Sequence, residues 1–227
     1  MARLRRHQLA RLTNAGWSTI LLRTWDEQAR ACLTHWATHR LPLVVTRQSV
    51  DAVDDGGIAL GLPSPAQWER RRLSLQVPHA AVLRFDEFPR LLEVQRLLPP
   101  SGQRPARELL DALDTCRATA RVFGSYGWQA ITDLAHVRPE SDLDLCIAVD
   151  GMEQADAVAH ALQSFSATKP LLDGELVFGD GAAVAWREWI EWRAGRARAV
   201  MVKRLDGVAL HRDGAWCERA DLAESVE

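Results

Sequence analysis

Apolar and polar positions alternate most regularly in the second half of the chain. Four apolar residues recur there at steps of four, three and four, namely Leu109, Leu113, Cys116 and Ala120. This spacing predicts a helix with one apolar face. Residues 143–149 form a largely apolar run that predicts a buried strand, and residues 152–165 return to helical spacing. This half of the chain therefore predicts a sheet covered by helices.

Shorter patterns extend this arrangement on both sides. Residues 121–123 and 175–178 predict short strands, and residues 184–192 predict a helix rich in tryptophan. Residues 199–210 contain two apolar runs around Asp206-Gly207, which predicts a hairpin. We therefore expect an α+β fold in which helices pack on a mixed sheet.

The first half of the chain has a weaker, mixed pattern. Residues 41–45 and 56–62 predict two strands, the second bounded by glycines. Residues 99–105 contain three prolines, a glycine and a serine, a composition that ends regular structure and commonly joins two domains. We therefore predict a smaller α/β domain over residues 1–98 and a helix-covered α+β domain over residues 105–227.

Charge and composition exclude several classes of function. The 227 residues carry 28 basic and 30 acidic side chains, and this near balance argues against a protein that binds DNA or RNA mainly by neutralising phosphates. No apolar run follows the basic N-terminus, and no uncharged stretch reaches the length that spans a membrane. The four cysteines lie far apart, without metal-binding or redox spacing. We expect a cytoplasmic protein with neither a nucleic-acid nor a membrane partner.

The stretch most informative about chemistry combines a glycine, a serine and two aspartates. Gly124-Ser125 follows a predicted strand, and Asp142 and Asp144 begin the next one after 16 intervening residues. Side chains two apart on a strand point to the same face, about 6.6 Å apart, so both carboxylates can bind one group of metal ions. Mg²⁺ held in this way bridges phosphate oxygens, and a Gly-Ser turn offers amides and a hydroxyl to terminal phosphates. The pattern predicts phosphoryl or nucleotidyl transfer.

These residues resemble the signature of the DNA polymerase beta-like nucleotidyltransferase superfamily. The resemblance implies a nucleotidyltransferase fold and a third carboxylate from a later strand. Asp173 and Glu175 share one face of the predicted strand there; we favour Glu175, with Asp173 next and Glu188 a weaker candidate. The gap of 16 residues is longer than usual for the superfamily, which predicts an inserted turn or short helix near residues 128–134.

Longer phrases resemble one family more closely. They comprise residues 121–129, 141–145, 173–177, 183–189 and 202–204. Together they resemble the phosphoribosyl-dephospho-CoA transferase associated with malonate decarboxylase, also called its holo-acyl-carrier-protein synthase. The resemblance implies transfer of a 5-phosphoribosyl-dephospho-CoA group from triphosphoribosyl-dephospho-CoA to a serine of the acyl carrier subunit, with release of pyrophosphate.

The resemblance also implies roles for the residues of the Gly-Ser and Asp-Leu-Asp motifs. Asp142 and Asp144 would bind Mg²⁺. Glu175 or Asp173 would complete the metal site or accept the proton of the serine. The Gly124-Ser125 turn would hold the triphosphate of the donor, where a close backbone and free amides are needed.

Basic and aromatic residues near these motifs are further candidates for binding the substrate. Lys203 and Arg204 could supply positive charge for phosphates, although basic residues near the end of a hairpin are more often simply solvated. Tyr126 and Trp128, beside the Gly-Ser turn, are candidates for stacking on the adenine of the donor. The tryptophans at steps of three in residues 186–192 indicate a buried core stripe instead.

Two other functions remain open from the residues. An enzyme of the same fold could use an ordinary nucleoside triphosphate on a small molecule or a protein. A relative without catalysis could bind a ligand or protein at the same place, although the intact pair Asp142 and Asp144 argues against this. We expect residues 1–98 to recognise the carrier, because they contain no second catalytic motif.

Overall fold

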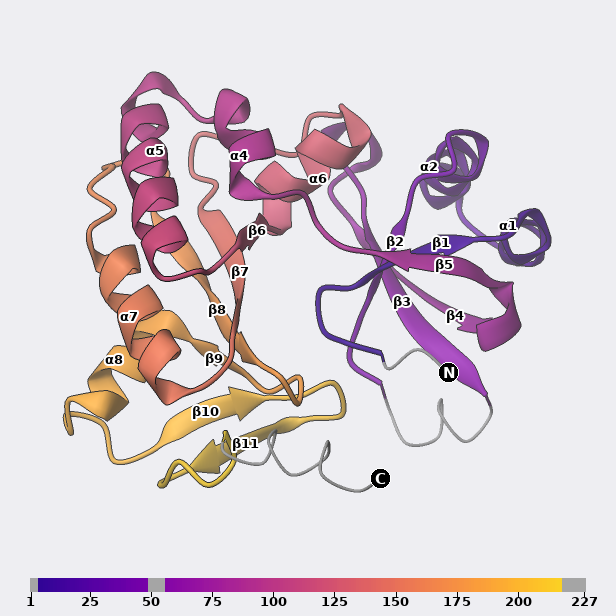
Figure 1. The fold of residues 1–227 in the computed structure, drawn as a ribbon. Coiled ribbons are helices and arrows are strands. Elements are labelled where there is room, and N and C mark those ends of the chain that lie inside the picture. The colour runs from indigo at the N-terminus through magenta and orange to yellow at the C-terminus, as the bar shows by residue number, and fades with distance from the viewer. Residues whose placement is uncertain (1–3, 49–55, 218–227) are drawn as a thin grey trace. The chain divides into compact units, whose positions relative to one another are not determined.

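The computed structural model describes residues 4–48 and 56–217, which form two compact units (Figure 1). The first unit comprises Met1–Phe88 together with Ile131–His136. The second unit comprises Pro89–Ala130 and Val137–Glu227. The chain thus leaves the first unit after Phe88, returns to it once for a short segment, and then completes the second unit.

Among its described residues, the first unit contains a five-stranded antiparallel sheet and two α-helices. Its strands are β1 (Leu9–Leu12), β2 (Leu43–Val45), β3 (Gly57–Pro63), β4 (Arg72–Pro78) and β5 (Val82–Asp86). Its helices are α1 (Asn14–Leu21) and α2 (Glu27–Thr38), and short 3-10 turns occupy Ala66–Trp68 and His79–Ala81. The strand order is β4-β3-β2-β1-β5. The two strands predicted in this half are confirmed as β2 and β3.

Side-chain caps and alternation explain the elements of the first unit. The side chain of Thr13 accepts a hydrogen bond from the amide of Gly16, which caps α1. Asp26 caps α2 in the same way through the amide of Ala29. β4 alternates exposed and buried residues at every step, as a strand does when one face lies on the core.

The second unit is a six-stranded mixed sheet, with α5 and α7 along one face (Figure 1). Its strands are β6 (Ala120–Val122), β7 (Leu143–Val149), β8 (Leu172–Phe178), β9 (Ala183–Ala185), β10 (Val200–Lys203) and β11 (Val208–His211). Its helices are α4 (Leu91–Val94), α5 (Pro100–Thr115), α6 (Gly124–Thr132), α7 (Met152–Gln163) and α8 (Trp186–Arg193), with a 3-10 turn at Gln95–Leu97. The order is β11-β10-β9-β8-β7-β6, and only β7 and β8 are parallel neighbours among the described strands. α7 supplies the crossover that a parallel pair requires.

β7 has one apolar face and one more polar face. Its apolar residues are each at most 2% exposed and belong to the core of the unit: Leu143, Leu145, Ile147 and Val149. The residues between them, Asp144, Cys146 and Ala148, point to the opposite face and are partly or fully exposed. Packing of the buried face holds the strand in place, so the other face can carry polar groups.

The proline-rich segment 99–105, predicted to be a linker, is instead the start of α5. Pro99 is the N-cap residue and Pro100 is the first helical residue. Proline suits the first turn of a helix, because the N–H that it lacks would have no partner within the helix there. The two compact units divide between Phe88 and Pro89, ahead of the predicted segment.

Most of the elements predicted in the second half are confirmed, and so is the α+β class. β7 and α7 match the predicted strand and the helix after it, and β10 and β11 form the predicted antiparallel hairpin. The tryptophan-rich segment differs in one respect, because β9 precedes α8 and the helix begins at Trp186. Within residues 4–48 and 56–217, no helix combines the length and the apolar character needed to cross a bilayer.

Candidate active site

Asp142 directly precedes β7 and Asp144 is its second residue, both next to a tight turn. The amide of Ser141 donates to the carbonyl of Arg138 at 3.0 Å, and the hydroxyl of Ser141 accepts from the amide of Arg138 at 2.9 Å. The amide of Leu143 donates a hydrogen bond of 2.8 Å to the carbonyl of Leu171, the residue that precedes β8. Because side chains alternate along a strand, Asp142 and Asp144 project to the same side of the sheet.

The parallel neighbour β8 brings two further carboxylates to this side. In the register of the two strands, Asp144 lies opposite Asp173, and Cys146 lies opposite Glu175. Residues opposite each other in neighbouring strands project from the same face of a sheet. Asp173 is exposed, whereas Glu175 is buried at 7% exposure. Asp173 is therefore the cross-strand partner of Asp144, and Glu175 lies two residues further along.

Burial and like charge act together on Asp144. Burial raises the pKa of its carboxyl group, and the negative charges of Asp173, Asp142 and Glu175 raise it further, to about 7. The four carboxylates are thus close enough to repel one another. A divalent cation bound among them would relieve this repulsion.

Gly124 brings the backbone against the carboxylate of Asp144. It follows β6, begins α6 and has a φ of +60°. A Cβ atom on Gly124 would lie 1.9 Å from Oδ2 of Asp144, so no side chain fits there. The amide of Phe123 donates to the carbonyl of Asp144 at 3.0 Å, which joins this turn to β7. The first-turn amides of α6, including that of Ser125, have no intrahelical acceptor and can bind an anion.

A second glycine lies on the other side of Asp144, in β8. Gly174 separates Asp173 from Glu175 and has a φ of +156°. A Cβ atom there would lie 2.2 Å from the carbonyl oxygen of Leu145. Only glycine allows the two strands to pair at this point, and this pairing sets where the two acidic side chains of β8 project.

The two basic residues that the sequence suggested for phosphate binding are both paired with acids. Nζ of Lys203 lies 2.9 Å from Oε1 of Glu175. Nη1 of Arg204 lies 2.5 Å from Oδ2 of Asp180 in the turn after β8. Arg204 is therefore held by the turn between β8 and β9. Lys203 is paired with Glu175, one of the three carboxylates whose charges act on Asp144.

The aromatic candidates beside the Gly-Ser turn are buried. Tyr126 is 3% exposed and Trp128 is 4% exposed, and Tyr126 belongs to the core of the second unit. Burial also raises the pKa of the Tyr126 hydroxyl. Helix α6 starts at Gly124 and both rings are buried, so the structure gives no support to their stacking on a ligand, and this role stays a prediction. The predicted core role of the tryptophan stripe is confirmed, since Trp186 and Trp189 are 4% and 0% exposed.

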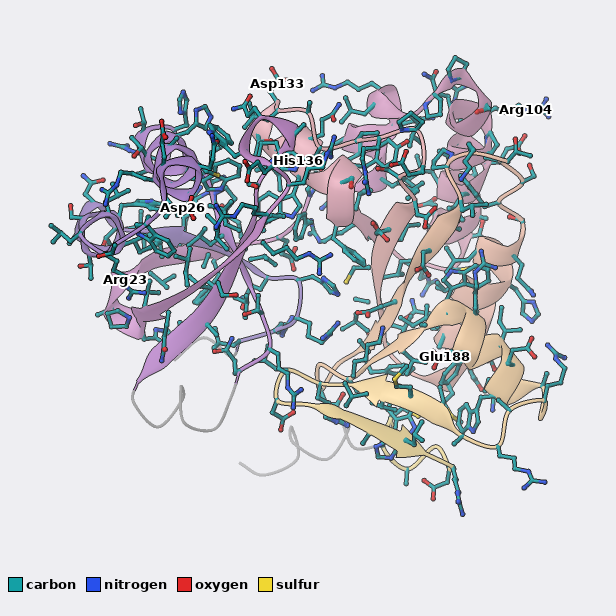
Figure 2. The ribbon with its side chains drawn as sticks, turned by 180° about the vertical axis from the view of Figure 1, so that it is seen from behind. Arg23, Asp26, Arg104, Asp133, His136 and Glu188 are labelled. Atoms are coloured by element: carbon teal, nitrogen blue, oxygen red, sulfur yellow. The ribbon has the colours of Figure 1, made fainter. Side chains whose placement is uncertain are left out.

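Glu188, the weakest of the carboxylate candidates, lies apart from this group. Figure 2 shows it on α8 beside β10, where its Oε2 accepts a hydrogen bond from the amide of Met201 at 3.4 Å. Its charge is not among those that raise the pKa of Asp144. His136, also labelled in Figure 2, belongs to the segment that joins the first unit, and burial lowers its pKa to about 4.

The donor chemistry of the carboxylate group fits Mg²⁺. This ion prefers oxygen ligands and is usually held by one or two protein carboxylates together with substrate phosphates and water. Asp142 and Asp144 are the pair that would hold it. Among the described side chains, no three acidic, histidine or cysteine residues form a ready-made metal site, so phosphates and water would supply the remaining ligands.

Comparison with known proteins places this chain in the class of transferases. Residues 90–214 match the family model described as phosphoribosyl-dephospho-CoA transferase MdcG C-terminal domain. Residues 5–88 match the model for the N-terminal domain of the same transferase. The two matches meet where the two structural units divide. The chain belongs to the phosphoribosyl-dephospho-CoA transferase family.

Curated relatives with that name cover most of the chain. The relative from Bradyrhizobium diazoefficiens is 33% identical over 209 residues, which are 90% of this chain and 88% of the relative. The relative from Xanthomonas campestris pv. campestris is 36% identical over 183 residues, 80% of this chain and 84% of the relative. The relative from Pseudomonas syringae pv. tomato is 27% identical over 189 residues, which are 78% of this chain and 82% of the relative. No solved structure matches the chain, so the nucleotidyltransferase fold stays a prediction.

Replacing Gly124 by alanine should destabilise the protein through the contact with Asp144. The added methyl group meets the carboxylate and the positive φ disfavours alanine, so we expect a loss of about 2–4 kcal/mol in the free energy of unfolding. Urea denaturation followed by tryptophan fluorescence measures it. Gly195→Ala is the matched control, because its φ is +71° but no atom lies within 4 Å of the added Cβ; it should cost only about 1 kcal/mol. Equal losses in the two variants would contradict the tight contact.

Replacing Asp144 by asparagine should stabilise the metal-free protein at high pH. In the folded protein Asp144 keeps its proton up to a pKa of about 7, against 3.8 for an ordinary aspartate, so its ionisation removes stability as the pH rises through this range. At pH 8 in EDTA, asparagine should raise the free energy of unfolding by on the order of 2–4 kcal/mol. Near pH 4 the gain should vanish.

Urea denaturation at both pH values measures this difference. Asp150→Asn, which neutralises an exposed residue just after β7, is the matched control and should show little change. A gain of the same size at pH 4 and pH 8 would contradict the electrostatic explanation.

Proposed function

We propose that this protein transfers the 5-phosphoribosyl-dephospho-CoA group from 2'-(5-triphosphoribosyl)-3'-dephospho-CoA to a serine hydroxyl of the apo acyl carrier subunit of malonate decarboxylase. Family membership supports the nature of the transferred group. The observation that carries the chemistry is the environment of Asp144, a carboxylate beside three others and against the Gly124 backbone. Such a place suits a polyphosphate accompanied by a divalent cation.

The proposed reaction exchanges a phosphoanhydride bond for a phosphodiester bond. The serine oxygen forms a bond to the α-phosphorus of the donor. The bond from that phosphorus to the oxygen bridging to the β-phosphate breaks, and pyrophosphate leaves with the electron pair. The proton of the serine passes to a base, for which an exposed carboxylate beside the metal-binding pair is suitable.

For this base we propose Asp173, although the sequence favours Glu175 as the third carboxylate. Asp173 is exposed and lies directly opposite Asp144. Glu175 is buried and paired with Lys203 at 2.9 Å, so it is less accessible to an incoming serine. We therefore assign the serine proton to Asp173.

The remaining roles follow from the same geometry. Asp142 and Asp144 would hold Mg²⁺, which when bound would neutralise charge on the departing pyrophosphate. Gly124 lets the backbone approach the phosphates closely, and Ser125 adds a hydroxyl and an amide at the start of α6. The part expected of the N-terminal domain in recognising the carrier stays a prediction.

Intact mass of the apo carrier subunit tests this proposal. With the donor and Mg²⁺, the wild-type protein should add one phosphoribosyl-dephospho-CoA group to the carrier. Asp142→Asn and Asp144→Asn should each slow the transfer by about 10²-fold or more, because each removes a charged ligand of the ion that stabilises the leaving group. Asp150→Asn removes an exposed carboxylate beyond the other end of β7 and should react at the wild-type rate.

Three outcomes would contradict parts of the proposal. Absence of any mass gain with the wild-type protein would remove the carrier as acceptor. Labelling of a protein or small molecule by ATP, without the CoA-derived donor, would favour a nucleotidyltransferase that uses ordinary nucleotides. Wild-type transfer by Asp144→Asn would exclude this carboxylate from the mechanism.

A further inference from the structure

Glu175 and Lys203 form an ion pair that reaches across an intervening strand. β9 lies between β8, which carries Glu175, and β10, which carries Lys203. Neighbouring strands are about 4.8 Å apart, so the backbones of β8 and β10 are separated by roughly 10 Å. Nζ of Lys203 nevertheless lies 2.9 Å from Oε1 of Glu175. Both side chains must therefore extend toward each other over β9.

β9 leaves this path open because its residues on that face are small. Lys203 lies opposite Ala183, and Glu175 lies opposite Ala185. The two alanines are two residues apart and so share a face of the sheet. Their methyl groups do not obstruct the path, and the apolar stem of a lysine packs readily on such a surface. A larger side chain on this face of β9 would stand between the two charges.

Resting on the proposed function, we propose that Glu175 is a positioning residue for Lys203 rather than a ligand of the metal ion, and that Lys203 binds the phosphates of the donor. The exposure of the pair supports this division, since the side chain of Glu175 is 8% exposed and that of Lys203 is 27% exposed. In the β7–β8 register Glu175 lies opposite Cys146, and Asp173 takes the place opposite Asp144. The buried acid is thus the anchor, and the more exposed ammonium group can reach a ligand.

An anchored ammonium group suits a polyphosphate. It has three N–H donors, one of which is directed at Glu175. The others can donate to phosphate oxygens. A lysine side chain is long and flexible, so holding it in place beforehand lowers the entropy lost when the phosphate binds. The ammonium group also offsets part of the negative charge that four carboxylates would present to an incoming anion.

Binding of Mn²⁺ and of inorganic tripolyphosphate to the full chain separates these roles without the donor or the carrier. In Mn²⁺ titrations followed by electron paramagnetic resonance, Glu175→Gln should bind within about twofold of wild type, whereas Asp144→Asn should bind about tenfold or more weakly. With Mn²⁺ present, Glu175→Gln and Lys203→Met should each weaken tripolyphosphate binding about tenfold. The double variant should lose no more than the single variants, because the two residues act as one unit.

Matched controls are available within the chain. Lys169→Met removes the charge of its other lysine, which is exposed, and should bind tripolyphosphate like wild type. Ala185→Leu keeps both charges but obstructs the path over β9, so it should weaken tripolyphosphate binding and spare Mn²⁺ binding. Ala148→Leu adds the same volume at an exposed position of β7 and should change neither.

Several results would overturn the inference. Glu175→Gln that weakens Mn²⁺ binding as much as Asp144→Asn would make Glu175 a metal ligand. Losses that multiply in the double variant would show that Glu175 and Lys203 act independently. Wild-type protein that binds Mn²⁺ but not tripolyphosphate would also overturn it. If these binding results hold while the carrier is never modified, the proposed acceptor fails and the assignment of Glu175 stands.

Discussion

The parallel pairing of β7 with β8 is the constraint on which the site depends. Its register places Asp144 opposite Asp173, and Glu175 lies two residues further along β8 on the same face. Burial, together with the negative charges of the neighbouring carboxylates, raises the pKa of Asp144 to about 7, which is unfavourable for folding when this group is ionised. The other face of β7 is fully buried in the core of the unit. The free energy gained by this apolar burial offsets the cost of holding several carboxylates close together.

Two glycines allow the backbone to approach this carboxylate group from both sides. Gly124 lies where any side chain would collide with Asp144, and Gly174 lies where one would collide with the backbone of β7. The first starts the helix whose free amides suit an anion, and the second keeps the acidic strand in register. Close backbone approach and concentrated negative charge are together what a site for a polyphosphate and its cation requires.

Sequence patterns predicted the elements whose spacing is regular over several residues. β7, α7 and β10 are examples, because each has a buried face that repeats along the chain. The proline-rich start of α5 misled the prediction, since proline both breaks helices and begins them. In the first unit β1, β4, β5 and the two described helices were not predicted, although β4 alternates exposed and buried residues at every step.

The candidate site was predictable only in part, for a related reason. A Gly-Ser followed by Asp-Leu-Asp is a local pattern, so Gly124 and Asp144 could be connected before their contact was seen. The pairing of Lys203 with Glu175 depends on strand order and on alanines in a third strand, and no local pattern reveals it. The burial of Tyr126 likewise depends on where helix α6 begins.

In the proposed mechanism, Asp142 and Asp144 form the place where a divalent cation meets the phosphates of the donor. Anomalous X-ray scattering from crystals grown with Mn²⁺ and tripolyphosphate tests this claim most directly. We expect a manganese peak within bonding distance of both carboxylates, with tripolyphosphate reaching the first turn of α6. A peak elsewhere, or ordered tripolyphosphate without manganese at these aspartates, would contradict it.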